Sequence, residues 1–192
     1  LARRGHAVTL VDDAPGVEAR ALAEELQQEL VVAPSAEAWP PLLGGAAGLA
    51  PSPGLPEAHP ALVAARATGT PVVGELDLAA AWDHRPTVAV TGTDGKTTVT
   101  TLVHEILTAS GVASALAGNT DVPLVAAIDD PGPEVFVVEA SSFRLAPLRS
   151  FAPRAGCWLN FAPDHGDVHA DLGTYEAAKA AIWRGFGPDQ LA

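Results

Sequence analysis

Val88-Ala-Val-Thr-Gly-Thr-Asp-Gly-Lys-Thr-Thr98 is the stretch of this chain that says most about its fold. It begins as a short apolar strand, turns through two glycines and continues into a segment with helical spacing. Glycines in such a turn let backbone N–H groups converge on a phosphate, and the helix N-terminus adds partial positive charge. The stretch therefore predicts a strand, a phosphate-binding loop and a helix.

The loop carries two side chains suited to a nucleotide. Lys96 can reach the β- and γ-phosphates, and the hydroxyl of Thr97 can bind Mg²⁺. Only Thr93 and Asp94 separate the first glycine from the Gly-Lys pair, so the motif is shorter than the usual one. An ordinary strand-to-helix turn is the alternative interpretation. We predict that ATP contacts Gly92, Thr93, Asp94, Gly95, Lys96, Thr97 and Thr98.

The segment after the loop has the apolar spacing of an amphipathic helix. Its apolar residues recur at intervals of three and four, which places them on one helical face. The residues that form this face are Val99, Leu102, Val103, Ile106 and Leu107.

Glu139 closes the apolar run Glu134-Val-Phe-Val-Val-Glu139, which is typical of a parallel strand buried on both faces. Ligands of open α/β sheets bind beyond the carboxyl ends of the strands. Mg²⁺ prefers oxygen ligands, so we predict that Glu139 completes a Mg²⁺ site with Thr97. Taken alone, a glutamate after a strand is an ordinary surface residue.

A further strand is expected at Ala155-Gly-Cys-Trp-Leu-Asn160, and it leads to Asp164 and His165. We predict that Cys157 is buried in this strand. His165 would lie at the carboxyl end of the strand, where it is suited to a second metal or to a phosphate.

Lys179 is one of only two lysines, beside nine arginines, and the other is Lys96. An ammonium fits a phosphate loop, and a neutral amine can react with carbon dioxide or a carbonyl. Lys179 follows Tyr175 in a predicted helix with Thr174 as its N-cap. An exposed lysine is the default for such a position, but the two contexts together indicate a chemical role for both lysines.

The composition excludes several classes of protein. Hydrophobic residues make up 48% of the 192, with a mean hydropathy of +0.20, which is typical of a globular chain. No apolar run reaches the roughly 18 residues of a transmembrane helix, and no signal peptide is recognisable. A net charge of −12 argues against a general nucleic-acid-binding surface. The single cysteine fits a reducing cytosol, so we expect a cytoplasmic protein.

Strand-like and helix-like segments alternate along the chain, which predicts an α/β fold with a mainly parallel sheet. The segment Trp82-Asp-His-Arg-Pro86 has the composition of a linker, so we place a boundary near 83–86, between domains of residues 1–84 and 85–192. Before this boundary we expect strands at 7–11 and 70–74, and helices at 18–30, 60–68 and 79–82. Between 34 and 60 we expect loops around short elements.

These motifs together resemble those of the Mur ligases, the ATP-dependent amide-forming enzymes of peptidoglycan precursor synthesis. The phosphate loop is similar to the family's shortened ATP loop, and Ala117-Gly-Asn119 to its turn that contacts the nucleotide-sugar substrate. Asn160 through His165 resembles the family's Asn-x-x-x-Asp-His stretch, and Tyr175-x-x-x-Lys179 resembles the segment with its carbamylated lysine. The resemblance covers most of the chain.

Within the family, the chain most resembles the member that adds D-glutamate to UDP-N-acetylmuramoyl-L-alanine. Four segments carry this likeness: Glu139-Ala-Ser-Ser-Phe-Arg-Leu145, Ser52-Pro-Gly-Leu-Pro56, His59-Pro60 and Val73-Gly-Glu-Leu-Asp-Leu78. The resemblance implies a partial Rossmann-like UDP-binding domain, then a partial P-loop-type central ATPase domain, with the C-terminal amino-acid-binding domain absent. It implies substrate contacts from Asp12, Ser52, Pro53, Gly54, Asn119, Ser141 and His165.

The resemblance also implies a set of cofactors and catalytic roles. ATP and two Mg²⁺ ions are expected, with metal ligands from Thr97, Glu139, His165 and a carbamylated Lys179, and catalysis by Lys96, Glu139, His165 and Lys179. The enzyme is expected to be a monomer without nucleic-acid or membrane partners, and this chain alone is expected to be inactive. Four features depart from the family pattern: Asp94 where Asn is common, Arg144 where Gln is usual, Asp121 where a small residue is expected, and Gly166-Asp-Val-His169, where a larger residue usually follows the histidine.

Other functions stay open at this point. A sister ligase or a folylpolyglutamate-type ligase would keep the ATP loop and change the acceptor. A plain phosphate-loop NTPase or kinase would need neither Lys179 nor the first domain. A non-catalytic module would bind the nucleotide sugar without Mg²⁺-dependent turnover of ATP.

Overall fold

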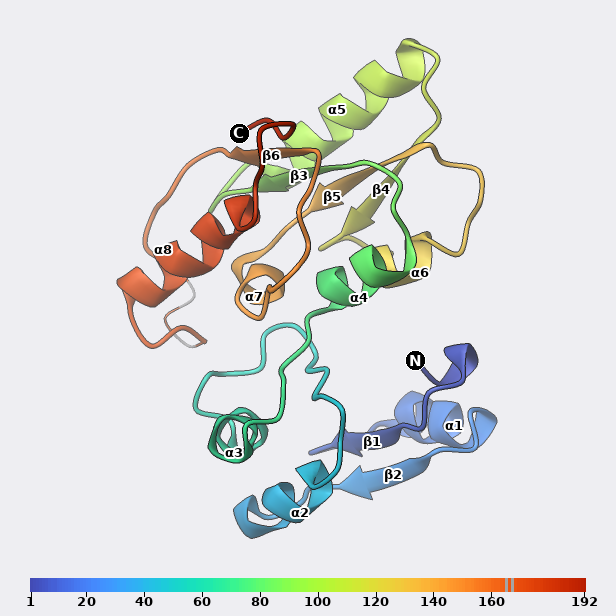
Figure 1. Cartoon of the computed structure of the whole chain (residues 1–192), viewed down its shortest axis with the longest axis vertical. Helices are drawn as coiled ribbons and strands as arrows, with labels where there is room; N and C mark the ends of the chain where they lie inside the picture. The colour runs from blue at the N-terminus through green and yellow to red at the C-terminus, as the bar shows by residue number, and fades with distance from the viewer. Residues whose placement is uncertain (165, 167) are drawn as a thin grey trace. The chain divides into compact units, whose positions relative to one another are not determined.

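Every paired strand of the chain runs parallel to its neighbour, in a computed structural model that describes residues 1–164, 166 and 168–192 (Figure 1). The predicted α/β class with mainly parallel sheets is therefore confirmed. Two compact units make up the chain, residues 1–46 with 60–70 and residues 47–59 with 71–192. Residues 71–84, which precede the predicted boundary, pack within the second unit.

The first unit is a β-α-β arrangement with two further helices. Its strands pair in the register Thr9↔Glu29 to Asp12↔Val32, and two of its helices, α2 and α3, pack against each other. Its elements in chain order are the 3₁₀ turn η1 (Ala2–Arg4), β1 (Thr9–Asp12), α1 (Val17–Glu25), β2 (Glu29–Val32), η2 (Ala36–Ala38), α2 (Trp39–Leu43) and α3 (Pro60–Thr68).

The helix predicted for residues 18–30 is too long at its end. It stops at Glu25, because Gln27 takes a left-handed backbone conformation with φ of 52°. The carboxamide of Gln28 then accepts a hydrogen bond from Val8 N at 3.2 Å and donates one to the carbonyl of Leu26 at 3.0 Å. Strand β2 begins directly after these bonds. Its four residues are too few for the alternation of apolar and polar side chains to indicate a strand.

The second unit is built on a four-stranded sheet in the order β4-β5-β3-β6. The strand predicted at 70–74 is wrong, since that segment forms only a single bridge, between Leu49 and Val72. The elements are α4 (Glu75–Trp82), β3 (Thr87–Thr91), α5 (Lys96–Ala109), β4 (Ser114–Gly118), α6 (Leu124–Ala127), β5 (Val135–Glu139), α7 (Ser142–Leu145), β6 (Ala155–Trp158), α8 (Leu172–Ala180) and the 3₁₀ turn η3 (Ala181–Trp183).

Helices cover both faces of this sheet (Figure 1). Helix α5 packs along β3, β4 and β5 on one face. The main core lies on the other face, where strand residues such as Phe136 and Val138 meet residues of α4, α6, α7 and η3. Because side chains alternate along a strand, Val137 points to the face covered by α5, and it too is fully buried. This double cover explains why β5 is continuously apolar.

The cover is incomplete beside β6, the last strand of the sheet. Cys157 is exposed there, so the prediction of a buried cysteine is wrong. The face of α5 predicted to be apolar is likewise only partly covered, since Leu102 and Ile106 are 57% and 56% exposed. An edge strand has a neighbour on one side only, and apolar sequence alone does not reveal which strand takes the edge.

Asp77 of α4 holds the segment that leads from α7 into β6. Its carboxylate is buried and accepts backbone hydrogen bonds from Arg149, Ser150 and Phe151 at 2.8–2.9 Å, and one from the Ser150 hydroxyl at 3.1 Å. Four hydrogen-bond donors on one carboxylate stabilise its negative charge and offset the free-energy cost of burying it.

Asp77→Ala is therefore expected to destabilise the protein by about 3 kcal/mol, because it leaves buried backbone N–H groups without an acceptor. At that cost the midpoint of thermal unfolding falls by roughly 6–12 °C. Asp77→Asn keeps one acceptor oxygen and should lose about half as much. The exposed Asp189 is the matched control, and an alanine there should leave the midpoint within about 2 °C. Equal midpoints for the Asp77 and Asp189 variants would contradict this account.

Candidate active site

The phosphate loop forms as predicted, between β3 and α5. Gly95 is the N-cap of α5 and takes a left-handed conformation with φ of 80°, which a residue with a side chain rarely adopts. The backbone N–H groups of the next three residues and of Gly95 itself find no acceptor among the described residues. Four unpaired N–H groups at an exposed helix start are a ready site for an anion.

Both lysines of the chain meet at the start of this loop. Lys96 Nζ donates to the carbonyl oxygens of Thr93 at 2.7 Å and Gly92 at 3.0 Å. Lys179 Nζ donates to the same Gly92 oxygen at 2.7 Å. The two lysines of this lysine-poor chain therefore lie at the same place in the fold, where their ammonium groups flank the loop.

Lys179 is buried in the second unit with only 2% of its surface exposed. Burial lowers the pKa of this lysine from its ordinary 10.5 to about 8, with a further lowering by the positive charge of Lys96. Its ammonium lies over the Tyr175 ring, 4.5 Å from the centroid, which offsets part of the cost of burial. At neutral pH a pKa of about 8 leaves roughly one amine in ten uncharged and nucleophilic.

Helix α8 carries Lys179 to the loop. Tyr175, Ala178 and Ile182 are buried along the same side, as the spacing predicts. The cap of this helix is Asp171 and not Thr174, because Asp171 Oδ1 accepts the backbone N–H of Thr174 at 2.7 Å. An aspartate three residues earlier is an equally good cap, so the sequence signal was ambiguous.

Glu139 ends β5 beside the loop, as predicted, and is 3% exposed. Its Oε2 accepts a hydrogen bond from the Thr97 hydroxyl at 2.7 Å, and its Oε1 accepts one from the Asn119 side-chain amide at 3.0 Å. A carboxylate, a hydroxyl and an amide from three different connections thus meet at the carboxyl edge of the sheet.

Gly118 allows Asn119 to come this close. Its φ is 101°, and a Cβ atom at this position would lie 2.3 Å from the Glu139 carbonyl oxygen. The Asn119 backbone N–H donates to that same oxygen at 2.8 Å. The predicted Gly-Asn turn is therefore a close backbone approach, which any side chain at Gly118 would block.

The remaining predicted substrate residues lie in different places. Ser141 precedes α7 and its buried hydroxyl has no hydrogen-bond partner among the described residues. Gly54, at the end of the predicted Ser52–Gly54 contact segment, lies against Phe143 of α7. Asp12 ends β1 in the first unit, where Oδ1 accepts the N–H of Ala14 at 2.8 Å. His165 lies outside the described residues.

The residues present fit a Mg²⁺ ion at Thr97 and Glu139. Both side chains offer oxygen, they touch at 2.7 Å, and the unpaired N–H groups beside them favour the phosphates that accompany Mg²⁺ in nucleotide sites. No group of three His, Cys, Asp or Glu side chains comes together within the described ranges. A metal at this site would therefore be bound largely by the hydroxyl, one carboxylate and the nucleotide itself.

Sequence reasoning gave no role to a second set of contacts on the loop. Asn160, after β6, accepts the N–H groups of Thr93 and Asp94 with its side-chain oxygen, each at 3.0 Å. The Tyr175 hydroxyl lies 3.1 Å from the Thr93 hydroxyl. Two signals pointed to Asn160: its position at a strand end, and its place at the start of the Asn-x-x-x-Asp-His stretch.

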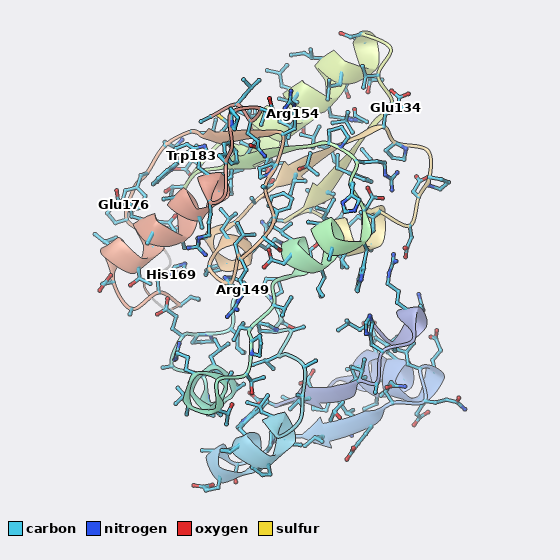
Figure 2. The ribbon with its side chains drawn as sticks, in the orientation of Figure 1. Glu134, Arg149, Arg154, His169, Glu176 and Trp183 are labelled. Atoms are coloured by element: carbon cyan, nitrogen blue, oxygen red, sulfur yellow. The ribbon has the colours of Figure 1, made fainter. Side chains whose placement is uncertain are left out.

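His169 belongs to another cluster that the sequence did not reveal. Its imidazole lies between α7 and the start of α8 (Figure 2), where Nε2 is 2.9 Å from the Ser142 hydroxyl. Nδ1 is 3.6 Å from a carboxylate oxygen of Glu57, and the ring packs on Tyr175 and Phe143. His169 is 4% exposed, so its part in the structure is to link these segments.

Comparison with known proteins identifies the class to which this fold and site belong. Residues 90–192 match the Mur ligase middle domain, so the chain belongs to the Mur ligase family. A solved structure of UDP-N-acetylmuramate:L-alanyl-gamma-D-glutamyl-meso-diaminopimelate ligase from Neisseria meningitides is similar in fold. It has a TM-score of 0.53 and 19% sequence identity, over 94% of this chain and 61% of that chain.

Two curated relatives carry the same name, UDP-N-acetylmuramoylalanine–D-glutamate ligase. The protein from Pelotomaculum thermopropionicum is 44% identical over 142 residues, which are 73% of this chain and 31% of the relative. The protein from Nitrosococcus oceani is 35% identical over 195 residues, which are 97% of this chain and 41% of the relative. The matched part of the chain thus spans from 31% to 41% of the length of these relatives. In its described part, no helix is both long enough and apolar enough to cross a membrane.

Proposed function

We propose that the protein containing this chain uses ATP to join D-glutamate to UDP-N-acetylmuramoyl-L-alanine in peptidoglycan precursor synthesis. The names of the relatives at 35–44% identity support the substrates. One observation in the molecule supports the chemistry, namely that Thr97 and Glu139 meet at 2.7 Å beside a helix start whose four N–H groups find no acceptor among the residues that the structure describes. That arrangement suits the triphosphate of a nucleotide and its metal ion.

The reaction would have two steps. The alanyl carboxylate attacks the γ-phosphorus, and the bond from that phosphorus to the bridging oxygen of ADP breaks. The amine of D-glutamate then attacks the acyl phosphate carbon, and the tetrahedral intermediate expels phosphate. The loop's part is to stabilise the transferring phosphoryl group, with the N–H groups from Gly95 to Thr98 and with Lys96 once it leaves the carbonyls of Gly92 and Thr93.

Mg²⁺ would neutralise charge on the phosphate oxygens, and Thr97 and Glu139 are the described residues that would hold it. A second Mg²⁺ would be held by Glu139, His165 and Lys179. Carbamylation of Lys179 would convert its cation into an anionic oxygen ligand. The lowered pKa of Lys179 supports this modification, because only the uncharged amine reacts with carbon dioxide.

The remaining assignments follow from this reaction. Residues 1–84 would form the UDP-binding domain, with Asp12 and Ser52 through Gly54 on the substrate, and residues 85–192 would belong to the central ATP-binding domain. Asn119 and Ser141 would contact the sugar-peptide end of the substrate. We place the enzyme in the cytoplasm, where ATP is available, and we propose that it acts as a monomer.

The deciding experiment measures phosphate release by the full-length protein with ATP, Mg²⁺ and UDP-N-acetylmuramoyl-L-alanine. D-glutamate is compared with L-lysine, meso-diaminopimelate and L-alanine as acceptors. Release that depends on D-glutamate alone supports the proposal down to the substrate. Release with another acceptor assigns the protein to a sister ligase, and release without any acceptor leaves a nucleotide triphosphatase.

A further inference from the structure

We propose that Asn160 is a positioning residue for the phosphate loop and takes the place of the residues by which this loop is shorter than the usual motif. The inference rests on the proposed function only in that the loop binds ATP, and it does not depend on the acceptor. Under this proposal the backbone N–H groups of the loop fall into two sets. Those of Thr93 and Asp94 are bound by Asn160, and those from Gly95 to Thr98 are available to phosphate.

The contacts of Asn160 form a complete clamp. Its side-chain oxygen accepts the backbone N–H groups of Thr93 and Asp94, each at 3.0 Å, and its side-chain NH₂ donates to the Asp94 carbonyl at 3.1 Å. Its own backbone carbonyl lies 3.3 Å from Thr93 N as a further acceptor. One side chain thus hydrogen-bonds to the backbone of both residues that separate the two glycines of the loop.

The clamp decides which groups face the nucleotide. A longer loop wraps its N–H groups around the phosphates, whereas the N–H groups of Thr93 and Asp94 point at Asn160 and are occupied. The next four N–H groups, from Gly95 to Thr98, have no acceptor in the part of the chain that the structure describes. Phosphate binding therefore falls to the start of α5 and to Lys96.

The clamp is itself fixed from outside the loop. The indole N–H of Trp158 donates to the Asn160 carbonyl oxygen at 2.8 Å. The Thr93 hydroxyl lies within 3.2 Å of both the N–H and the carbonyl of Ala162. These bonds join the loop after β3 to the segment after β6, two neighbouring parallel strands. Asn160 is thus held in place before any nucleotide binds, as preorganisation requires.

Asparagine is suited to this task in a way that aspartate is not. A carboxylate could still accept both N–H groups, but it could not donate to the Asp94 carbonyl, and it would add a negative charge beside the phosphate site. Alanine would remove all three side-chain bonds. The alanine variant therefore tests the hydrogen bonds of Asn160, and the aspartate variant tests the effect of an added negative charge.

The test uses the full-length protein and the non-hydrolysable ATP analogue AMP-PNP with Mg²⁺, with the Kd measured by calorimetry. Asn160→Ala is expected to raise this Kd about tenfold at any salt concentration, which corresponds to about 1.4 kcal/mol. Asn160→Asp should also raise it, but added salt should relieve the effect because salt screens the new charge. The Kd for UDP-N-acetylmuramoyl-L-alanine should stay within twofold in both variants.

Gln28→Ala is the matched control. Gln28 is also a carboxamide that accepts a backbone N–H and donates to backbone carbonyls, but it lies in the first unit. Its replacement should leave the Kd of AMP-PNP unchanged. An unchanged Kd in Asn160→Ala would overturn the proposal. So would a parallel loss of AMP-PNP affinity, UDP-substrate affinity and thermal stability, because a general structural role predicts all three. Neither outcome depends on whether D-glutamate is the acceptor.

Discussion

Replacement of Lys179 by alanine is expected to lower kcat on the order of 10³-fold in the full-length protein, the size of effect seen when one preorganised charge-stabilising group is lost. Lys179 is 2% exposed and its Nζ lies 2.7 Å from the Gly92 carbonyl oxygen, so alanine would leave its position beside the loop without an ammonium. Steady-state phosphate release at saturating ATP measures the loss.

Rescue by small anions distinguishes a carbamate from an ammonium at this position. If the working form of Lys179 is a carbamate, acetate or bicarbonate should restore part of the activity of Lys179→Ala, because each can bring an anionic oxygen into the space that the side chain left. Lys179→Arg keeps a cation and should be neither active nor rescued, since arginine fills the space and cannot be carbamylated. Full activity in either variant would exclude the carbamate.

The same residue gives a pH dependence with a definite sign. The pKa of Lys179 is about 8 in the folded protein and 10.5 ordinarily, so the unfolded chain binds more protons between these values and stability rises with pH in that window. Below pH 8 the folded protein carries the full cost of a buried charge. Lys179→Met removes this cost, so in Mg²⁺-free, degassed buffer it should be more stable than the parent at pH 7.

The advantage of Lys179→Met should shrink as the pH rises from 8 to 10.5, because in this window the folded parent loses the buried proton while the unfolded chain keeps it, so the parent becomes more stable. Parallel denaturant titrations at pH 7 and pH 10 give the comparison. A variant that is inactive and yet more stable at pH 7 marks Lys179 as a residue retained for function at a cost in stability. A variant less stable at both pH values would show that the lysine is held for packing instead.

The chemistry of this site could be predicted from the sequence further than its packing could. The phosphate loop follows one predicted strand, Glu139 ends another and Lys179 lies in a predicted helix, and hydrophobic periodicity and glycine indicate such elements. Because the carboxyl ends of parallel strands share one edge of a sheet, the sequence predicts that the loop and Glu139 lie together there. The carboxylate and hydroxyl of the predicted Mg²⁺ pair do meet, at 2.7 Å.

The contacts of Asn160 and the exposure of Cys157 could not be predicted in the same way. Both depend on the order of strands in the sheet, which places β6 beside β3 and at the edge of the described sheet, and strand order is a long-range property. The missed strand β2 has a local cause instead, the left-handed backbone of Gln27, which its side chain does not favour. Asp77 was missed because its three backbone partners lie more than seventy residues away.

Replacement of Glu139 by glutamine is expected to have an effect as large as that at Lys179. Glutamine keeps the length of the side chain but has one acceptor oxygen in place of two, so it cannot accept from both Thr97 and Asn119. It also removes the negative charge that Glu139 brings to the proposed Mg²⁺ site. We expect kcat to fall on the order of 10³-fold and the Mg²⁺ concentration needed for half-maximal rate to rise at least tenfold.

A change in both kcat and the Mg²⁺ concentration for half-maximal rate distinguishes a metal ligand from a carboxylate with a structural role. Glu139→Asp keeps the charge and both oxygens on a shorter stem, so it should retain more activity than Glu139→Gln and should be partly restored by raised Mg²⁺. The control is Glu134, an exposed carboxylate that directly precedes the same strand at its opposite end (Figure 2). Glu134→Gln should leave the Mg²⁺ dependence unchanged. If Glu139→Gln loses activity with the parent's Mg²⁺ dependence, the carboxylate serves only to orient Thr97 and Asn119, and the metal must be held elsewhere.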